Sequence, residues 1–268
     1  MNNAVVTARG ATKVFGAGAD QTRALDAIDL EIGKGAFVSL IGPSGCGKST
    51  LLRLVGDLTQ PTAGSVLVNG KSAHQARLDR DYGIVFQSPV LFDWRTVEEN
   101  VELPLEVSAI DKRTRAERAR KMLALVELSG FERRYPWQLS GGMQQRVAIA
   151  RALSFEPAIL LMDEPFGALD EMTRERLNLE LLGIWRQTGT TIVFVTHSIP
   201  EAVFLSTRVV VMSARPGRII DVIDVDLPQP RNDLTREDPR YFSFVTRVRE
   251  SLRGKVARTP AFARTAAT

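Results

Sequence analysis

The sequence predicts an α/β fold built on a parallel sheet, with an antiparallel β subdomain at the N-terminus and a helical subdomain. Three observations predict it. Short, continuous apolar runs, typical of buried parallel strands, alternate with segments of helical periodicity. Near the N-terminus, apolar and acidic residues alternate as in a half-buried antiparallel strand. Residues 88–157, between two buried runs, read as a helix-rich insertion.

Length and composition fit this class. The chain has 268 residues, enough for one large α/β domain, and its 44% hydrophobic and 25% charged content is ordinary for a globular protein. No apolar run approaches the roughly 18 residues of a membrane span, and the first ten residues lack the plan of a signal peptide. We therefore expect a cytosolic protein that meets a membrane only through a partner. The single cysteine excludes an intrachain disulfide. One cysteine and two histidines also provide few ligands for a transition-metal site.

The N-terminal strands come first. Ala4–Ala8 and Leu25–Ile32 are predicted strands on either side of a turn-rich stretch, Gly16–Thr22. Ser65–Val68, closed by Asn69–Gly70, predicts a hairpin strand and its turn. These elements together make up the predicted antiparallel subdomain.

The parallel sheet is predicted from four buried runs, with two further strands near the C-terminal end. The buried runs are Ala36–Ile41, Ile84–Phe86, Ala158–Met162 and Thr191–Thr196; the later strands are Arg208–Ser213 and Arg218–Val225. Helices are predicted between them, at about Lys48–Gly56, Asp170–Gln187 and Pro200–Leu205. Strands that alternate with helices in this way indicate a doubly wound sheet.

A proline-rich step, Leu227–Pro230, divides the chain into a domain over residues 1–230 and a C-terminal segment, 231–268. That segment is predicted to hold one helix, Arg236–Arg253, and a disordered basic tail after Gly254. From Leu227 onward there are nine basic and four acidic residues. Such a surplus can contact nucleic acid or an anionic membrane, but a solvated surface helix with a frayed end is the more common reason for it, and we expect no nucleic-acid partner.

A glycine-rich turn follows the strand Ala36–Ile41 and precedes a helix. Its spacing, glycine, four residues and Gly-Lys-Ser, is that of a phosphate-binding loop, in which successive backbone N–H groups and a helix N-terminus face an anion. Lys48 can reach the β- and γ-phosphates of ATP, and the hydroxyl of Ser49 can bind Mg²⁺. The sheet is therefore predicted to be a P-loop NTPase core. The loop comprises Gly42, Pro43, Ser44, Gly45, Cys46, Gly47, Lys48, Ser49 and Thr50.

Two carboxylates end another buried strand. The run Ile159–Met162 is followed by Asp163 and Glu164, which places both acids at the carboxyl edge of the sheet. Beside a phosphate loop, Asp163 is expected to hold Mg²⁺, through water, and Glu164 to activate the attacking water as general base. Taken alone, the pair could equally be the first turn of a helix.

With these motifs in order, the chain resembles the ATP-binding subunits of ABC transporters over about residues 4–225. Leu139–Arg146 looks like the signature of that family, with Met143 where glutamine is frequent. The resemblance implies that Ser140, Gly141 and Gly142 donate to the γ-phosphate of ATP. It also implies a head-to-tail dimer, in which the phosphate loop of one copy faces the signature of the other.

The same resemblance assigns roles to four further residues. It makes Gln87 the loop glutamine that reaches the metal and the water, and His197 the switch histidine at the γ-phosphate. Asp170 resembles the loop aspartate that couples the two copies. Phe15 stands where the family places an aromatic ring on adenine, although packing in the core is the other interpretation of this residue.

Within the family, the chain resembles the importers of nitrate, sulfonates, taurine and similar small solutes. The resemblance rests on Leu91–Val101, Thr196–Val203 and Met212–Ile219, with Asp93 in place of an expected proline. It implies an ATPase that is bound to permease subunits at the cytoplasmic face of the membrane. A periplasmic or extracellular binding protein would deliver the solute to that permease. Pro89–Val101 is the candidate permease-docking stretch. The alternatives are the ATPase of an exporter or lipid transporter, or a non-transport ABC ATPase, which usually carries a coiled coil, a zinc insertion or a second ATPase half.

Overall fold

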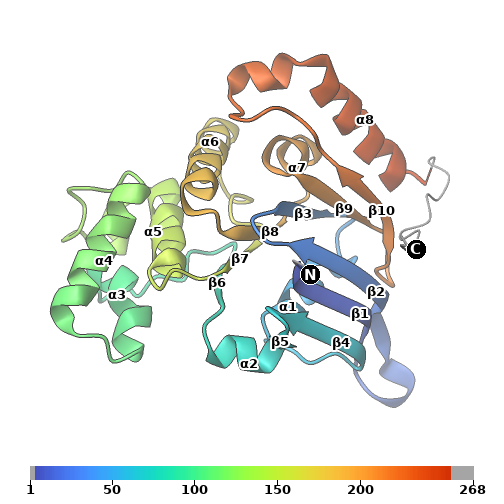
Figure 1. Ribbon diagram of the computed structural model, residues 1–268, viewed down its shortest axis with the longest axis horizontal. Coiled ribbons are helices and arrows are strands. Elements are labelled where there is room, and N and C mark those ends of the chain that lie inside the picture. The colour runs from blue at the N-terminus through green and yellow to red at the C-terminus, as the bar shows by residue number, and fades with distance from the viewer. Residues whose placement is uncertain (1–3, 255–268) are drawn as a thin grey trace, which may run out of the picture.

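The computed structural model describes residues 4–254 and contains two sheets with α1 between them (Figure 1). The parallel sheet carries more helices on its other face, and a group of helices lies to one side. This is the predicted α/β arrangement. The predicted disordered tail after Gly254 lies outside the described residues.

The N-terminal sheet is antiparallel and has the order β2-β1-β4-β5. Its strands are β1 (Ala4–Phe15), β2 (Thr22–Gly33), β4 (Ala63–Val68) and β5 (Lys71–Ser72). The first strand continues beyond the predicted Ala4–Ala8, because a bulge interrupts the alternating sequence pattern after Ala8. Gly10 has φ +54°, and the pairing with β2 shifts between Ala8 and Ala11. A bulge changes which residues face the core, so the period-2 pattern that predicts a strand breaks there.

The second sheet has the order β10-β9-β3-β8-β7-β6. Its strands are β3 (Phe37–Ile41), β6 (Tyr82–Val85), β7 (Ile159–Asp163), β8 (Thr191–Val195), β9 (Arg208–Met212) and β10 (Ile219–Asp224). All neighbours are parallel except β9 and β10, which form a hairpin at one edge. The hairpin also reaches the other sheet, through a bridge between Leu25 and Gly217.

The central strand β3 is buried on both faces and separates two apolar cores. Phe37 and Ile41 pack into one core, whereas Val38 and Leu40, which point the opposite way, pack into the other. The second core lies between the sheets, around α1 (Lys48–Val55). Helices α6 (Glu171–Thr188), α7 (Ile199–Leu205) and α8 (Pro239–Leu252) cover the opposite face (Figure 1).

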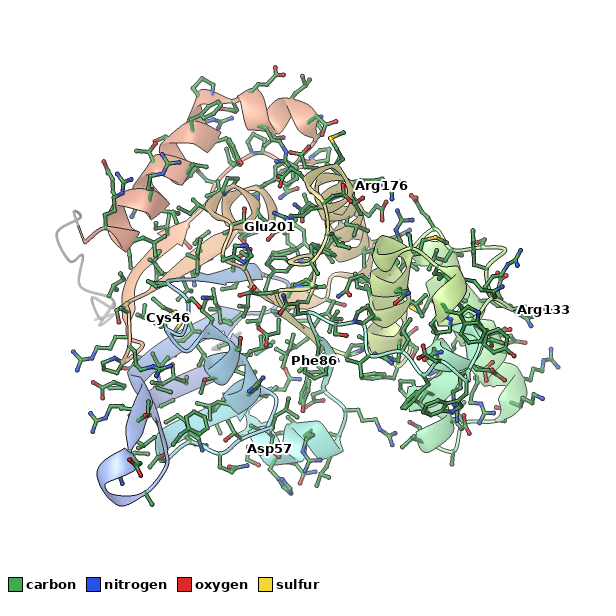
Figure 2. The ribbon with its side chains drawn as sticks, turned by 180° about the vertical axis from the view of Figure 1, so that it is seen from behind. Cys46, Asp57, Phe86, Arg133, Arg176 and Glu201 are labelled. Carbon is green, nitrogen blue, oxygen red and sulfur yellow. The ribbon has the colours of Figure 1, made fainter. Side chains whose placement is uncertain are left out.

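Three helices between β6 and β7 form the group at the side of the molecule (Figure 1). They are α3 (Val97–Val107), α4 (Lys112–Leu125) and α5 (Gly141–Leu153). Thr96 and Glu99 start α3 with a capping box. Arg146 of α5 forms a salt bridge with Glu180 of α6, which ties the group to the sheet domain. Figure 2 shows Arg133 at its outer edge.

One helix was not expected. The short α2 (Ala73–Leu78) follows β5, and the hydroxyl of Ser72 caps it by accepting from the backbone N–H of Gln75 at 3.2 Å. A helix of six residues gives too little periodicity to predict. No helix among the described residues is long and apolar enough to cross a membrane.

Candidate functional site

The carboxyl ends of three neighbouring parallel strands, β3, β8 and β7, meet at one edge of the sheet. Backbone hydrogen bonds hold the residues that leave these strands together. The N–H of Thr196 donates to Leu40 O at 3.3 Å, and the N–H of Glu164 donates to Val195 O at 3.0 Å. The loops that carry the predicted site residues therefore start side by side, as expected for a ligand site in an open α/β sheet.

The glycine-rich loop lies between β3 and α1, and its conformation requires glycine. Gly45 and Gly47 have φ of +72° and +98°, in the left-handed region. A Cβ atom at Gly47 would also lie 2.6 Å from Leu25 Cδ2 and 3.0 Å from Ala24 O. Gly47 occupies the N-cap position of α1, where no side chain caps the first turn. The N–H groups of that turn are left for an anion.

Lys48 lies inside this loop. Its Nζ donates to the carbonyl oxygens of Gly42 at 2.9 Å and Pro43 at 3.1 Å, and the residue is only 5% exposed. Its third contact is the Cys46 Sγ at 3.9 Å, so this buried ammonium has only uncharged partners and lacks a counter-charge. An anion cradled by the loop would supply one.

The hydroxyl of Ser49 donates to Asp163 Oδ1 at 2.7 Å. The two residues come from different elements, the start of α1 and the end of β7, and present two hard oxygen atoms at one point. Mg²⁺ binds through one or two carboxylate or hydroxyl oxygens and keeps several waters and phosphate oxygens. The donor set therefore fits a Mg²⁺–nucleotide. The described residues contain no group of three or more His, Cys, Asp or Glu arranged to hold a metal by themselves.

Glu164 and His197 form the second pair at this edge, with Glu164 Oε2 3.2 Å from His197 Nδ1. Glu164 has φ +48°, which is unusual for a residue other than glycine and common at functional sites. A Cβ atom at Gly167 would lie 3.4 Å from Gln87 Nε2 and 3.6 Å from Glu164 Oε2, so both side chains end beside this glycine. A carboxylate, a histidine and an amide thus lie close together at the end of β7, whose last residue is Asp163.

These loops line a cleft of about 410 Å³, and Phe15, at the end of β1, lines it too. Phe15 is 44% exposed, so it is not packed in the core, and Lys13 Nζ lies 5.1 Å from its ring centre. The cleft is large enough for a nucleotide. It is lined by Phe15, Thr22, Ala24, Ser44, Gly45, Gly47, Lys48, Ser49, Thr50, Glu164, His197 and Arg215.

Cys46 belongs to the loop but does not line the cleft, because its side chain is fully buried. Figure 2 shows it close to the N-terminal strands. It acts as a small packing residue here.

The predicted signature residues do not line this cleft. Ser140 caps α5, accepting from the N–H of Met143 at 3.3 Å, and the glycines after it let α5 approach the start of α6. A Cβ atom at Gly142 would lie 2.9 Å from Thr173 Cγ2. Asp170 caps α6 by accepting from the N–H of Thr173 at 2.9 Å, and hydrogen bonds from Thr173 lower the pKa of Asp170. The start of α5 therefore packs against the first turn of α6, which Asp170 caps, and neither Ser140 nor Asp170 lines the cleft of its own chain.

Sequence reasoning missed three cleft residues, Thr22, Ala24 and Arg215. Thr22 and Ala24 begin β2, where no motif marks them. Arg215 lies in an Arg-Pro-Gly run that stood out only as a mark of the subgroup.

Comparisons with known proteins agree with this geometry. A family model described as "ABC transporter" matches residues 25–167. An uncharacterized ABC transporter ATP-binding protein of Methanocaldococcus jannaschii is 51% identical over 230 residues, 86% of this chain and 85% of the relative. The aliphatic sulfonates import ATP-binding protein of Bacillus cereus is 45% identical over 227 residues, 85% and 88% of the two chains. Among solved structures, the ATP-binding cassette MJ0796, in a dimeric post-hydrolysis state bound to ADP and Pi, is 38% identical in sequence. It matches with a TM-score of 0.72 over 82% of this chain and 98% of that chain.

Proposed function

Because this chain belongs to the ABC transporter family and is the ATPase subunit of a transporter, we propose that it powers the import of a small solute such as a sulfonate, nitrate or taurine. The Bacillus cereus relative is an aliphatic sulfonates import protein, which supports import, as do the three subgroup segments of the sequence. The observation that carries the enzymatic part is that Ser49, Glu164 and His197 line one cleft beside the phosphate loop, where Ser49 also donates a hydrogen bond to Asp163.

In this proposal ATP lies along the cleft. Its adenine stacks on Phe15, and its phosphates receive hydrogen bonds from the backbone of the loop Gly42–Thr50 and from Lys48. Ser49 and Asp163 would hold Mg²⁺, and Gln87 would reach the metal and the attacking water. When bound, the metal neutralises charge on the β- and γ-phosphates.

Hydrolysis requires a water molecule aligned with the γ-phosphorus. Glu164 accepts the proton of that water as it attacks, and the bond from the γ-phosphorus to the bridging oxygen of ADP breaks. His197, 3.2 Å from Glu164, orients this carboxylate and contacts the γ-phosphate. Glu164 directly follows Asp163 at the end of β7, so the proposed base comes next to a proposed metal ligand.

A second copy of the chain completes the site. Ser140, Gly141 and Gly142 are absent from the cleft of their own chain, as is Asp170, so they can serve the cleft of a partner. The dimeric state of the similar cassette supports this arrangement. Closure of two copies around ATP would transmit force to the permease, and hydrolysis would release them.

The permease is proposed to dock at Pro89–Val101. Trp94 is 74% exposed and lies against Phe92, with ring centres 4.9 Å apart. The buried Asn100 fixes the stretch by accepting from the N–H of Phe92 at 2.8 Å, and Arg151 of α5 donates to the carbonyl of Val90 at 2.7 Å. A stretch that is anchored at its base yet exposes large apolar side chains suits a protein interface. The protein would then lie at the cytoplasmic face of the membrane, held there by its permease.

The test of the ATPase site is Glu164→Gln. We expect hydrolysis to fall by about 10²–10⁴-fold, the usual contribution of a general base, while Mg·ATP binding persists and ATP traps a dimer on size-exclusion chromatography. Glu237→Gln, at an exposed glutamate outside the cleft, is the control and should hydrolyse ATP normally. Full turnover by Glu164→Gln would exclude Glu164 as the base.

The test of import is reconstitution with the co-purifying permease in proteoliposomes. ATP-dependent uptake of a sulfonate, nitrate or taurine that needs the solute-binding protein would support the proposal. ATP-dependent movement in the opposite direction, or of lipid, would replace it with the exporter function.

A further inference from the structure

The hairpin between β9 and β10 carries the Arg-Pro-Gly run, to which the proposed function gives no role. Its glycine, Gly217, is buried against the phosphate loop and the start of β2. The N–H of Gly217 donates to Ala24 O at 2.9 Å, and the N–H of Asp26 donates to Gly217 O at 3.0 Å. A Cβ atom at Gly217 would lie only 2.0 Å from Cys46 O. The hairpin therefore lies directly on the backbone of the phosphate loop.

A second attachment also joins the hairpin to β2. Arg218 forms a salt bridge with Asp26 of β2, to which its Nε donates at 2.8 Å. The hydroxyl of Ser213 accepts from the N–H of Arg218 at 3.0 Å, which closes the turn. Arg215 thus projects from a turn that is held on both sheets.

Arg215 itself lines the nucleotide cleft. Its Nε lies 3.4 Å from Gly45 O, a weak contact, and a Cβ atom at Gly45 would be 3.4 Å from its Nη2. Within residues 4–254 it forms no salt bridge, in contrast to Arg218. An exposed guanidinium without a carboxylate partner, next to a loop built for phosphate, has most of its donors free.

We propose that Arg215 binds the phosphate chain of the nucleotide as a second cation, alongside Lys48. This inference rests on the proposed function, since it takes the cleft as the ATP site. Lys48 lies inside the loop, whereas Arg215 approaches from the β9–β10 hairpin, so the two charges come from different elements. A guanidinium can donate two parallel hydrogen bonds to phosphate oxygens, which an ammonium cannot. The Arg-Pro-Gly run is then part of the nucleotide site, with Gly217 as its contact point on the loop.

The competing explanation is that Arg215 only braces the Gly45 carbonyl. Three substitutions that change the charge at this position distinguish phosphate binding from bracing: Arg215→Lys, Arg215→Gln and Arg215→Glu. For each variant, the affinities for Mg·ATP and Mg·ADP are measured by titration calorimetry. If the side chain binds phosphate, affinity should follow its charge. We expect a loss of about three-fold or less for Lys, about 3- to 10-fold for Gln, after allowing for solvent screening, and a larger loss for Glu.

The control is Arg208→Gln. Arg208 lies at the far end of the same β9–β10 pair, where it forms an exposed salt bridge with Asp224, and its loss should leave nucleotide affinity unchanged. Melting temperatures of all variants check that the fold is retained. An equal loss for all three Arg215 variants, or no loss, would overturn the inference in favour of a brace or of no role. If the wild-type chain failed to bind ATP, the proposed function itself would fall.

Discussion

The contact between Gly217 and the phosphate loop gives a sharp prediction for Gly217→Ala. The new Cβ would lie 2.0 Å from Cys46 O and 3.2 Å from Ala24 O, whereas real Cβ atoms essentially never approach closer than 3.0 Å. The hairpin and the loop must therefore separate by about 1 Å, and because both neighbours are backbone atoms, no side-chain rotation relieves the clash. Overpacking of this kind costs about 1–3 kcal/mol.

The separation also strains two backbone hydrogen bonds, between Gly217 and Ala24 and between Asp26 and Gly217. Each contributes about 1 kcal/mol. We therefore expect the free energy of unfolding to fall by about 2–5 kcal/mol, a large share of the 5–15 kcal/mol typical of a domain. ATP affinity should fall at least about ten-fold, or about 1.4 kcal/mol, because the displaced residue, Cys46, belongs to the phosphate loop.

Urea unfolding and calorimetric ATP titration measure the two effects. Gly183→Ala is the matched control, since a Cβ at this helical position meets nothing within 4 Å. That change should leave ATP affinity unchanged and add up to about 1 kcal/mol of stability from helix propensity. A Gly217→Ala protein with wild-type unfolding and wild-type affinity would refute the reasoning, because it would mean that the hairpin does not press on the loop.

Two further predictions concern the buried ionisable side chains Lys48 and Glu201. Lys48→Ala should weaken Mg·ATP binding by at least about ten-fold in the same titration, because it removes the cation inside the loop; unchanged affinity would contradict the phosphate-binding assignment. Burial raises the pKa of Glu201 above its ordinary value of 4.5. The folded chain then holds this proton more tightly than the unfolded chain, so stability is lost as the pH rises from 4.5 through the raised pKa. Urea unfolding across pH measures how steeply the free energy of unfolding falls. Glu201→Gln should make this fall shallower, whereas Glu237→Gln, at an exposed glutamate, should not change it. An unaltered pH dependence in Glu201→Gln would count against a buried, proton-binding Glu201.

Much of the site could be predicted from the sequence because its signals are local. Gly45 and Gly47 are needed for a turn whose geometry is set within a few residues, and Asp163 directly follows an apolar run. Such features carry their own spacing, and four of the residues they single out, Lys48, Ser49, Glu164 and His197, line one cleft in the structure.

Other features depend on contacts between distant segments. Arg215 reaches the cleft because Gly217 packs against Cys46, about 170 residues away in the chain, and no local pattern encodes that approach. The length of β1 depends on a bulge that shifts its register against β2. Thr22 enters the cleft because it pairs with Phe15 at the end of β1, a pairing that no motif at Thr22 marks.

The sequence by itself determined the class of fold and singled out the proposed phosphate loop and the proposed hydrolytic acids, because periodicity and short motifs depend on neighbours along the chain. Only the tertiary structure decided that Phe15 is exposed at the cleft, that Ser140 does not line the cleft of its own chain, and that the β9–β10 hairpin packs on the loop with Arg215 beside it. These outcomes follow from how two sheets pack around α1, and that packing is a property of the whole chain.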